Sequence, residues 1–239
     1  MKLLALILIL CPSLAWAAPT FDAATTGTGN GVSSVTVNHT VGAGCSNPII
    51  VVGISWQKNP TGTLDTLTVG GVGGTEIDTS NWSASGGYTH ELWYRVGASG
   101  ANDVIATFDA AKNSITVGVR SYCGVDQVTP IGTANKATGL SGTNPTVDIT
   151  SAAGELVVDM VSSVPDAGSQ TLTVGASQTD RANFAQDATN HIQGGSEEAG
   201  AATTTMSWTL GTVGAWGSIG VPLKPSSSST RRPGGVFIF

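Results

Sequence analysis

The sequence predicts an all-β protein, an antiparallel β-sandwich of jelly-roll type followed by a flexible C-terminal tail. Apolar and polar residues alternate with a period of two along most of the chain, as in strands that bury one face. Glycine-rich turn signals separate these runs at short intervals. Helical periodicity is confined to a weak pattern at 181–188, so nothing supplies the crossover helices of a parallel α/β fold.

The composition is that of a folded protein with few charges. Of 239 residues, 40% are hydrophobic and 11% are charged. Disordered chains are instead rich in charge and poor in apolar residues, which excludes disorder as the main description. The formal net charge of −6 comes without the clustered cations that phosphate binding requires. A nucleic-acid partner is therefore not expected.

Residues 1–17 are expected to be a signal peptide. Lys2 precedes the apolar run 3–10, and residues 15–17 (Ala-Trp-Ala) have the small–x–small pattern that signal peptidase cleaves. The run is shorter than the roughly 20 residues that span a bilayer, so no membrane span is expected. A lipoprotein signal is disfavoured because Leu10, and not a small residue, precedes Cys11. We therefore expect a secreted protein, extracellular or at the cell surface.

The expected strands follow from the alternating runs, which lie at 35–40, 89–96, 115–120, 156–161 and 219–223. The continuous apolar run 49–56 is expected to be a central strand covered on both faces, with Trp56 in the core. No repeat of fixed period is evident. We expect one domain over 18–225, and a split at the linker-like segment 138–145 is the alternative.

Two cysteines, Cys45 and Cys123, remain after removal of the signal peptide. An exported chain meets an oxidising compartment, so we expect them to form a disulfide. Two buried free thiols on neighbouring strands are the alternative. A catalytic thiol is disfavoured because no histidine lies near either cysteine in the sequence.

Six segments occur in an order that suggests a family: NPIIVVGISW (47–56), HELWY (90–94), GVDQVTPIG (124–132), GELVVD (154–159), MSWT (206–209) and 216–225. With them the chain resembles the jelly-roll domain of secreted bacterial and phage-associated proteins, most of which have no assigned function. The resemblance covers roughly residues 20–225. It implies a fold and an extracellular setting, but it brings no catalytic motif that could be assigned to residues here.

Motifs for catalysis and metal binding are weak. The chain has no Gly-x-Ser-x-Gly elbow in a strand–turn–helix context and no Asp-x-Asp-x-Asp-Gly calcium loop. His39, His90 and His191 lack metal-ligand spacing, and the first two are interpreted as strand side chains. We therefore expect no cofactor and no metal site; calcium would be possible in a jelly roll but nothing in the sequence supports it.

Carboxylates could serve a glycoside hydrolase, which requires two that face each other. The candidates are Glu76 with Asp78 on one strand face, the adjacent pair Glu197 and Glu198, and Glu91.

A sugar-binding surface is a second expectation. Glu91, Trp93 and Arg95 share one strand face, and an aromatic ring there could stack on a pyranose. Solvated edge charges around a half-buried tryptophan are the alternative. Trp82 follows polar residues, and we expect its ring to be exposed in a loop, where it could contact a glycan or a partner.

The segment 226–239 reads as a solvated tether with an apolar tip of high β propensity. Adding this tip as a strand to the open sheet edge of another subunit would satisfy its backbone and bury its rings. The assembly residues expected here are Arg231, Arg232, Val236, Phe237, Ile238 and Phe239. A frayed tail and an outer-membrane assembly signal are the alternatives.

These observations favour a secreted, non-enzymatic surface or structural protein. It would be a subunit of an extracellular or virion-like assembly, joined to itself or to another surface protein through its C-terminal strand. A carbohydrate-binding adhesion module is the alternative, and a glycoside hydrolase is the third possibility.

Overall fold

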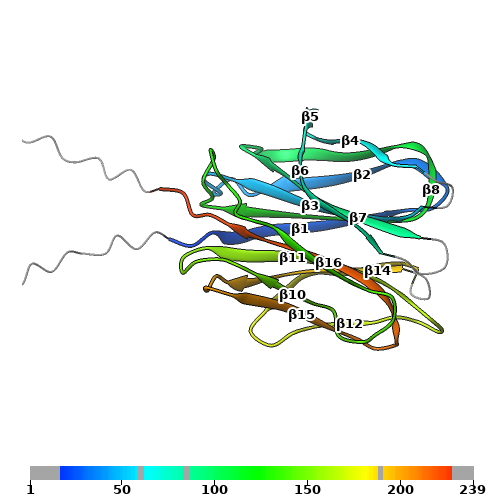
Figure 1. Cartoon of the computed structure of the whole chain (residues 1–239). Helices are drawn as coiled ribbons and strands as arrows, with labels where there is room; N and C mark the ends of the chain where they lie inside the picture. The colour runs from blue at the N-terminus through cyan, green and yellow to red at the C-terminus, as the bar shows by residue number, and fades with distance from the viewer. Residues whose placement is uncertain (1–16, 59–61, 83–86, 188–190, 228–239) are drawn as a thin grey trace, which may run out of the picture.

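The computed structural model describes residues 17–58, 62–82, 87–187 and 191–227 (Figure 1). These residues form sixteen β-strands and no helix. All pairings among the named strands are antiparallel. The predicted fold class, an all-β antiparallel sandwich, is therefore confirmed.

The first half of the chain, here called the first unit, contains two sheets that share one long strand. Its strands are β1 Thr20–Gly29, β2 Val32–Val41, β3 Ile49–Gln57, β4 Leu64–Val69, β5 Val72–Gly73, β6 Thr75–Trp82, β7 Tyr88–Val96 and β8 Gly100–Cys123. The first part of β8 belongs to a sheet with the strand order β5-β4-β8-β2, which we call the first outer sheet. The second part of β8 belongs to a sheet with the strand order β6-β7-β3-β8-β1, which we call the first inner sheet. Ser114, at φ 54°, lies where the pairing partners of β8 change.

The second half, the second unit, repeats this plan. Its strands are β9 Asn135–Gly139, β10 Thr146–Ile149, β11 Leu156–Pro165, β12 Leu172–Val174, β13 Thr179–Asp187, β14 His191–Ala199, β15 Thr204–Leu210 and β16 Gly214–Leu223. The second inner sheet has the order β13-β14-β11-β16-β9, and the second outer sheet has the order β10-β15-β12. The segment 181–188, with its weak helical pattern, belongs largely to strand β13. Two register shifts in β13 break the period-two alternation, which explains the ambiguous pattern.

The two units have the same topology. Strand order matches when β1 is aligned with β9, β3 with β11, β7 with β14, and β8 with β15 followed by β16. The pentapeptide TLTVG occurs at 66–70 and at 171–175, on the equivalent strands β4 and β12. This short identity is the sequence signal of the repeat. The chain passes between the units at 124–134, ahead of the segment 138–145, and the domain boundaries 18–225 stay a prediction.

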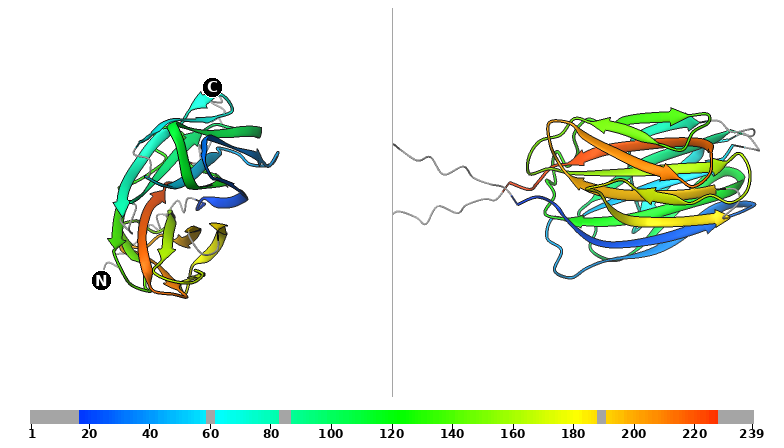
Figure 2. Two further views of the ribbon diagram at one scale, coloured as in Figure 1. Left: turned by 90° about the vertical axis from the view of Figure 1, so that its right-hand side faces the viewer. Right: turned by 90° about the horizontal axis from the view of Figure 1, so that it is seen from below.

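The two inner sheets pack face to face in a way that resembles an isologous dimer (Figures 1 and 2). Strand β1 of the first unit contacts β13 of the second, and β6 of the first contacts β9 of the second. Since β9 is the counterpart of β1, and β13 is the counterpart of β6, the same pair of edges meets on both sides of the interface. The four sheets thus form four layers, with the two outer sheets farthest apart. Figure 2 shows that the chain enters and leaves at the same end of the molecule.

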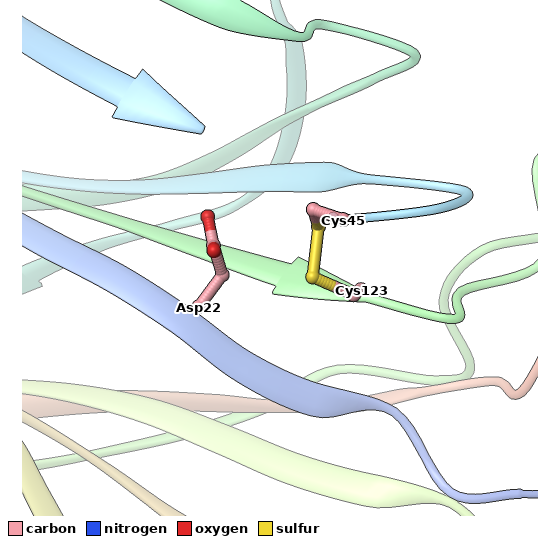
Figure 3. A group of neighbouring side chains, drawn as sticks. All are labelled: Asp22, Cys45 and Cys123. Carbon is pink, nitrogen blue, oxygen red and sulfur yellow. A yellow bond between two sulfur atoms is a disulfide. The ribbon is translucent and has the colours of Figure 1, made fainter. Parts of the chain in front are cut away.

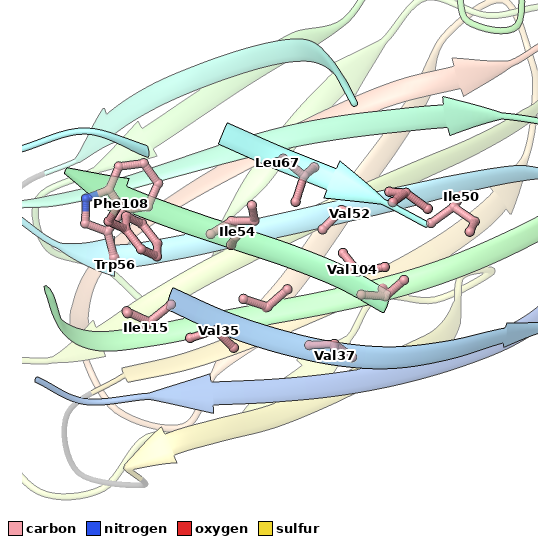
Figure 4. Packing of buried hydrophobic residues seen from close by; sticks show 14 of the residues in the cluster. Val35, Val37, Ile50, Val52, Ile54, Trp56, Leu67, Val104, Phe108 and Ile115 are labelled. Atoms are coloured by element: carbon pink, nitrogen blue, oxygen red, sulfur yellow. The ribbon is translucent and has the colours of Figure 1, made fainter. Parts of the chain in front are cut away.

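Strand β3 explains why a fully apolar run is needed at 49–56. Ile50, Val52, Ile54 and Trp56 face the first outer sheet, while Ile49 and Val51 face the second unit. Trp56 is 1% exposed and packs edge-to-face on Phe108 in the core of the first unit (Figure 4). The expectation for this strand and for Trp56 is confirmed.

The inner sheets bury an apolar core at the end of the molecule that holds the disulfide. Its members include Ile49, Val51, Leu92, Tyr122, Val158, Met160, Ile219 and Leu223. At the opposite end the same interface is polar, with Ser55, His90, Ser162 and His191 all fully buried. The two units therefore share one core rather than touching through solvated surfaces.

Candidate functional site

Trp82 is buried, so the expectation of an exposed ring is wrong. It ends strand β6, is 2% exposed and stacks on Tyr88 with ring centroids 4.9 Å apart. Val164 and Ala215 of the second unit complete the cluster around it. The polar residues before it belong to the strand and not to a loop, and period-two alternation turns the indole towards the second unit. This burial removes Trp82 from the candidate glycan-binding residues.

Glu91, Trp93 and Arg95 lie as expected on one face of β7, and all three are half-buried. This face is turned away from the second unit, because Leu92, between them, packs in the core between the inner sheets. The Trp93 indole Nε1–H donates to Glu91 Oε2 at 2.8 Å, which fixes the orientation of the ring. The strand β6 places Glu76 opposite Trp93 and Thr79 opposite Glu91. We call Glu76, Glu91, Trp93 and Arg95 the β7 face.

The two carboxylates of the β7 face have different electrostatic surroundings. The pKa of Glu91 is raised to about 7. Burial is the main cause, the hydrogen bond from Trp93 opposes the rise, and the nearby Glu76 carboxylate contributes to it. Glu76 itself is exposed on β6. A carboxyl that is part protonated at neutral pH can donate as well as accept a hydrogen bond. The face therefore offers a fixed aromatic ring flanked by acceptors, a donor and a guanidinium.

The other candidate carboxylate pairs do not face each other. A register shift between Glu76 and Asp78 places Asp78 opposite Leu92, on the other face of the strand from Glu76. The Asp78 carboxylate instead accepts from Lys136 Nζ at 2.7 Å. Glu197 pairs with Arg181, and its neighbour Glu198 lies on the opposite face of β14. The expectation that Glu76 and Asp78 share a face is wrong because a bulge breaks the alternation.

The edges of the inner sheets leave a groove where β6 meets β9. It has a volume of about 480 Å³ and is lined by Thr79, Ser80, Asn81, Lys136, Ala137 and Thr138. Lys136 Nζ donates to the Thr79 carbonyl at 2.7 Å as well as to Asp78. Asp78 Oδ1 also accepts from the Thr79 backbone N–H. This ion pair satisfies both backbone groups of Thr79 on an edge strand, a role that edge charges commonly serve.

Cys45 and Cys123 form the expected disulfide, with Cα atoms 5.0 Å apart (Figure 3). It joins the loop after β2 to the end of β8. Asp22 of β1 lies beside it, and Asp22 Oδ2 accepts from Gly42 N at 3.0 Å and from Ser121 Oγ at 2.7 Å. The disulfide prediction is confirmed.

The C-terminal segment is fixed to the body as far as Ser226. Pro225 forms a β-bridge with Val125, and Ser226 N donates to the Gly124 carbonyl at 2.7 Å. Lys224 N donates to the Pro130 carbonyl at 2.8 Å. Ser226 therefore lies next to Gly124, the residue that follows the disulfide-linked Cys123. The predicted assembly residues Arg231, Arg232, Val236, Phe237, Ile238 and Phe239 lie outside the described residues, as does the predicted signal peptide up to residue 16.

Two buried histidines form a polar cluster that the sequence did not reveal. His191 Nδ1 lies 2.7 Å from the Ser114 carbonyl, which can only accept, so this nitrogen carries the proton. Ser55 Oγ lies 3.0 Å from His191 Nε2 and 3.1 Å from the Thr89 carbonyl, and its single proton can be donated to only one of these two acceptors at a time. Neither ring nitrogen of His90 has a hydrogen-bond partner among the described residues. The interpretation of His90 as a strand side chain holds, and His39 is likewise a buried strand residue.

Burial keeps both histidines neutral. The pKa of His90 is lowered to about 3, chiefly by burial and in smaller part by the nearby His191 and Lys136. Burial lowers the pKa of His191 to about 4. Ser55 and His191 have the contact of a nucleophile and its base, but both are completely buried. In this structure the pair therefore joins strand β3 of the first unit to strand β14 of the second.

No protein-family model, no curated protein and no solved structure matches this chain. The resemblance to the jelly-roll family therefore stays a prediction. The described residues contain no helix that is long and apolar enough to cross a membrane.

Proposed function

We propose that the chain is an exported, non-enzymatic structural protein that assembles through its C-terminal segment. The observation that carries the proposal is the anchored exit of that segment. The chain is bridged to the body up to Ser226, beside a disulfide that fastens the end of β8. A pull on the segment beyond would be transmitted to the shared core and would not peel a free strand away.

The composition of the segment 228–239 supports a docking role. It carries two adjacent arginines followed by Pro-Gly-Gly-Val-Phe-Ile-Phe, in a chain whose formal net charge is −6. A strand added to the sheet edge of another subunit would bury these apolar side chains, and the arginines would face an acidic body. Export, expected from the leader at 1–17, agrees with the formed disulfide.

Light scattering on the mature chain and on a chain ending at Ser227 tests this proposal. The full chain is expected to form oligomers whose mass rises with concentration, and the truncated chain is expected to stay monomeric. A Phe237→Asp variant keeps both arginines and separates apolar docking from charge attraction, because it should lose assembly as the truncation does. Equal masses for the full and truncated chains would contradict the proposal.

A second function, carbohydrate binding, is favoured by the β7 face. The fixed ring of Trp93 and the flanking Glu91, Glu76 and Arg95 offer stacking together with donors and acceptors for sugar hydroxyls. The groove where β6 meets β9 is not lined by residues of this face, and binding is therefore proposed in place of hydrolysis.

A glycan array followed by titration of the best sugar tests the second function. Trp93→Ala should abolish binding, and Trp93→Phe should retain part of it, because the phenyl ring stacks but cannot donate to Glu91. Trp216, a half-buried tryptophan of the second unit, supplies the matched control, and Trp216→Phe should leave affinity unchanged. Equal affinity of the wild type and Trp93→Ala would exclude this face, and release of reducing sugar would point to a hydrolase instead.

A further inference from the structure

The side chains of Asp22, Cys45 and Cys123 form a compact group at the end of the first inner sheet (Figure 3). One carboxylate oxygen and the two sulfurs all lie within 4.8 Å of one another. They come from strand β1, the loop after β2 and the end of β8, so the fold brings them together from distant parts of the chain. All three residues are half-buried, which leaves the group accessible to small solutes.

The Asp22 carboxylate is held in place by one of its oxygens. Oδ2 accepts from the backbone of Gly42 and from the hydroxyl of Ser121. Oδ1 has no hydrogen-bond partner within the described part of the chain. Carboxylates anchored by outer hydrogen bonds in this way are typical metal ligands, because the anchor orients the free oxygen.

We propose that reduction of the Cys45–Cys123 disulfide converts this group into a binding site for a thiophilic divalent cation such as Zn²⁺. In the oxidised chain each sulfur is bonded to the other and carries no charge. A dithiol reductant supplies two electrons and two protons, its own sulfurs become a disulfide, and the two cysteines become thiols. The cation then replaces both thiol protons, which pass to solvent, and it is bound by two thiolates and the Asp22 carboxylate.

The geometry suits a tetrahedral ion. Zn–S bonds of about 2.3 Å and Zn–O bonds of about 2.0–2.2 Å place ligand atoms roughly 3.5 Å apart. One carboxylate oxygen of Asp22 lies within 4.8 Å of both sulfurs. On reduction the sulfurs can separate to the spacing of zinc ligands by side-chain rotation, while their Cα atoms stay 5.0 Å apart. Three formal negative charges face a dication, and water takes the fourth position. The disulfide and the bound metal would thus be alternative cross-links between the loop after β2 and the end of β8.

Cobalt binding to the full mature chain tests the proposal. The protein is reduced with dithiothreitol, freed of reductant under nitrogen and titrated with Co²⁺ alone. A sulfur-to-cobalt charge-transfer band together with intense four-coordinate visible bands is expected in the reduced chain, and neither band in the oxidised chain. Zn²⁺ should bleach both bands at one equivalent.

Two variants separate a three-ligand site from adventitious thiolate binding. Asp22→Asn keeps the hydrogen-bond acceptor but removes the charge, and it should weaken Co²⁺ binding at least about tenfold. Asp65→Asn removes a carboxylate from the exposed surface of β4, and it should change nothing. Absence of the charge-transfer band in the reduced wild type, or equal affinity of Asp22→Asn and the wild type, would overturn the proposal. So would loss of the native circular dichroism on reduction, because the site requires β1 and β8 to stay together.

Discussion

Individual residues in the interface between the units show how burial decides their chemistry. His90 and His191 stand in the layer between the inner sheets, where no carboxylate forms a hydrogen bond with either ring among the described residues. Their neutral forms fit this environment, and a proton on either would place an unpaired charge in a buried layer.

Acid should therefore weaken the fold through these two histidines. Their pKa values are about 3 and about 4 in the folded chain, below the ordinary 6.5. The unfolded chain consequently binds more protons between pH 6.5 and these values. The folded state therefore keeps its full stability above pH 6.5 and loses stability as the pH falls from 6.5 towards 4 and 3. At pH 4 each histidine should cost about 3 kcal/mol of unfolding free energy.

Urea denaturation of the oxidised protein at pH 7 and pH 4 measures this loss. A His90→Gln/His191→Gln double variant supplies the comparison, because glutamine keeps hydrogen-bonding capacity without titrating. The wild type should lose more free energy between the two pH values than the variant does, by about 6 kcal/mol for the pair. Parallel losses in both proteins would mean that carboxylates, and not these histidines, set the acid sensitivity.

The packing of strand β16 against the first unit depends on Gly217, which has no side chain. Gly217 lies where β16 passes beneath β6 and β7 of the first unit. A Cβ atom built there would lie 2.5 Å from Trp82 Cδ1 and 2.6 Å from His90 Cε1, far inside van der Waals contact. The glycine therefore sets how closely the two inner sheets approach at their polar end.

Gly217→Ala should destabilise the protein by about 1–3 kcal/mol, because two buried rings must move to admit one methyl group. Gly73→Ala is the matched control, since Gly73 also lies in a strand and a Cβ there meets no atom within 4 Å. Thermal unfolding of both variants measures the difference. A drop in melting temperature for Gly73→Ala as large as for Gly217→Ala would show that glycine flexibility, and not the close approach, is responsible.

The whole molecule consists of two sandwiches whose inner sheets share one hydrophobic core. Met160 of the second unit is fully buried and packs against Gly53 of the first, where an added Cβ would lie 2.9 Å from its sulfur. Because neither inner sheet can expose this surface without a large apolar cost, the units should unfold together.

Met160→Ala should lower the unfolding free energy by about 2–5 kcal/mol and should do so for both units at once. Native-state amide exchange can follow β4 in the first outer sheet and β15 in the second, both remote from the substitution. Protection at the two strands should fall by the same amount. Val72→Ala, at a position 48% exposed, should change neither. Faster exchange in β15 alone would show that the units unfold independently.

The sequence by itself predicted the strands at 35–40, 49–56, 89–96, 115–120, 156–161 and 219–223. It also predicted the burial of Trp56, a disulfide between Cys45 and Cys123, and the shared face of Glu91 and Trp93. These predictions rest on period-two alternation and on the oxidising compartment expected from the leader, both of which are inferred from local or compositional properties. Where bulges interrupt the alternation, as between Glu76 and Asp78 and within β13, the local pattern misleads.

Only the tertiary structure decided that the chain forms two units of equal topology packed through their inner sheets. That packing buried Trp82, whose polar neighbours suggest a loop, and it joined His191 to Ser55 across 136 residues. It also placed Asp22 beside the disulfide. The physical reason is that alternation specifies which residues share a face of a sheet, whereas the surface that covers this face comes from strands far away in the chain.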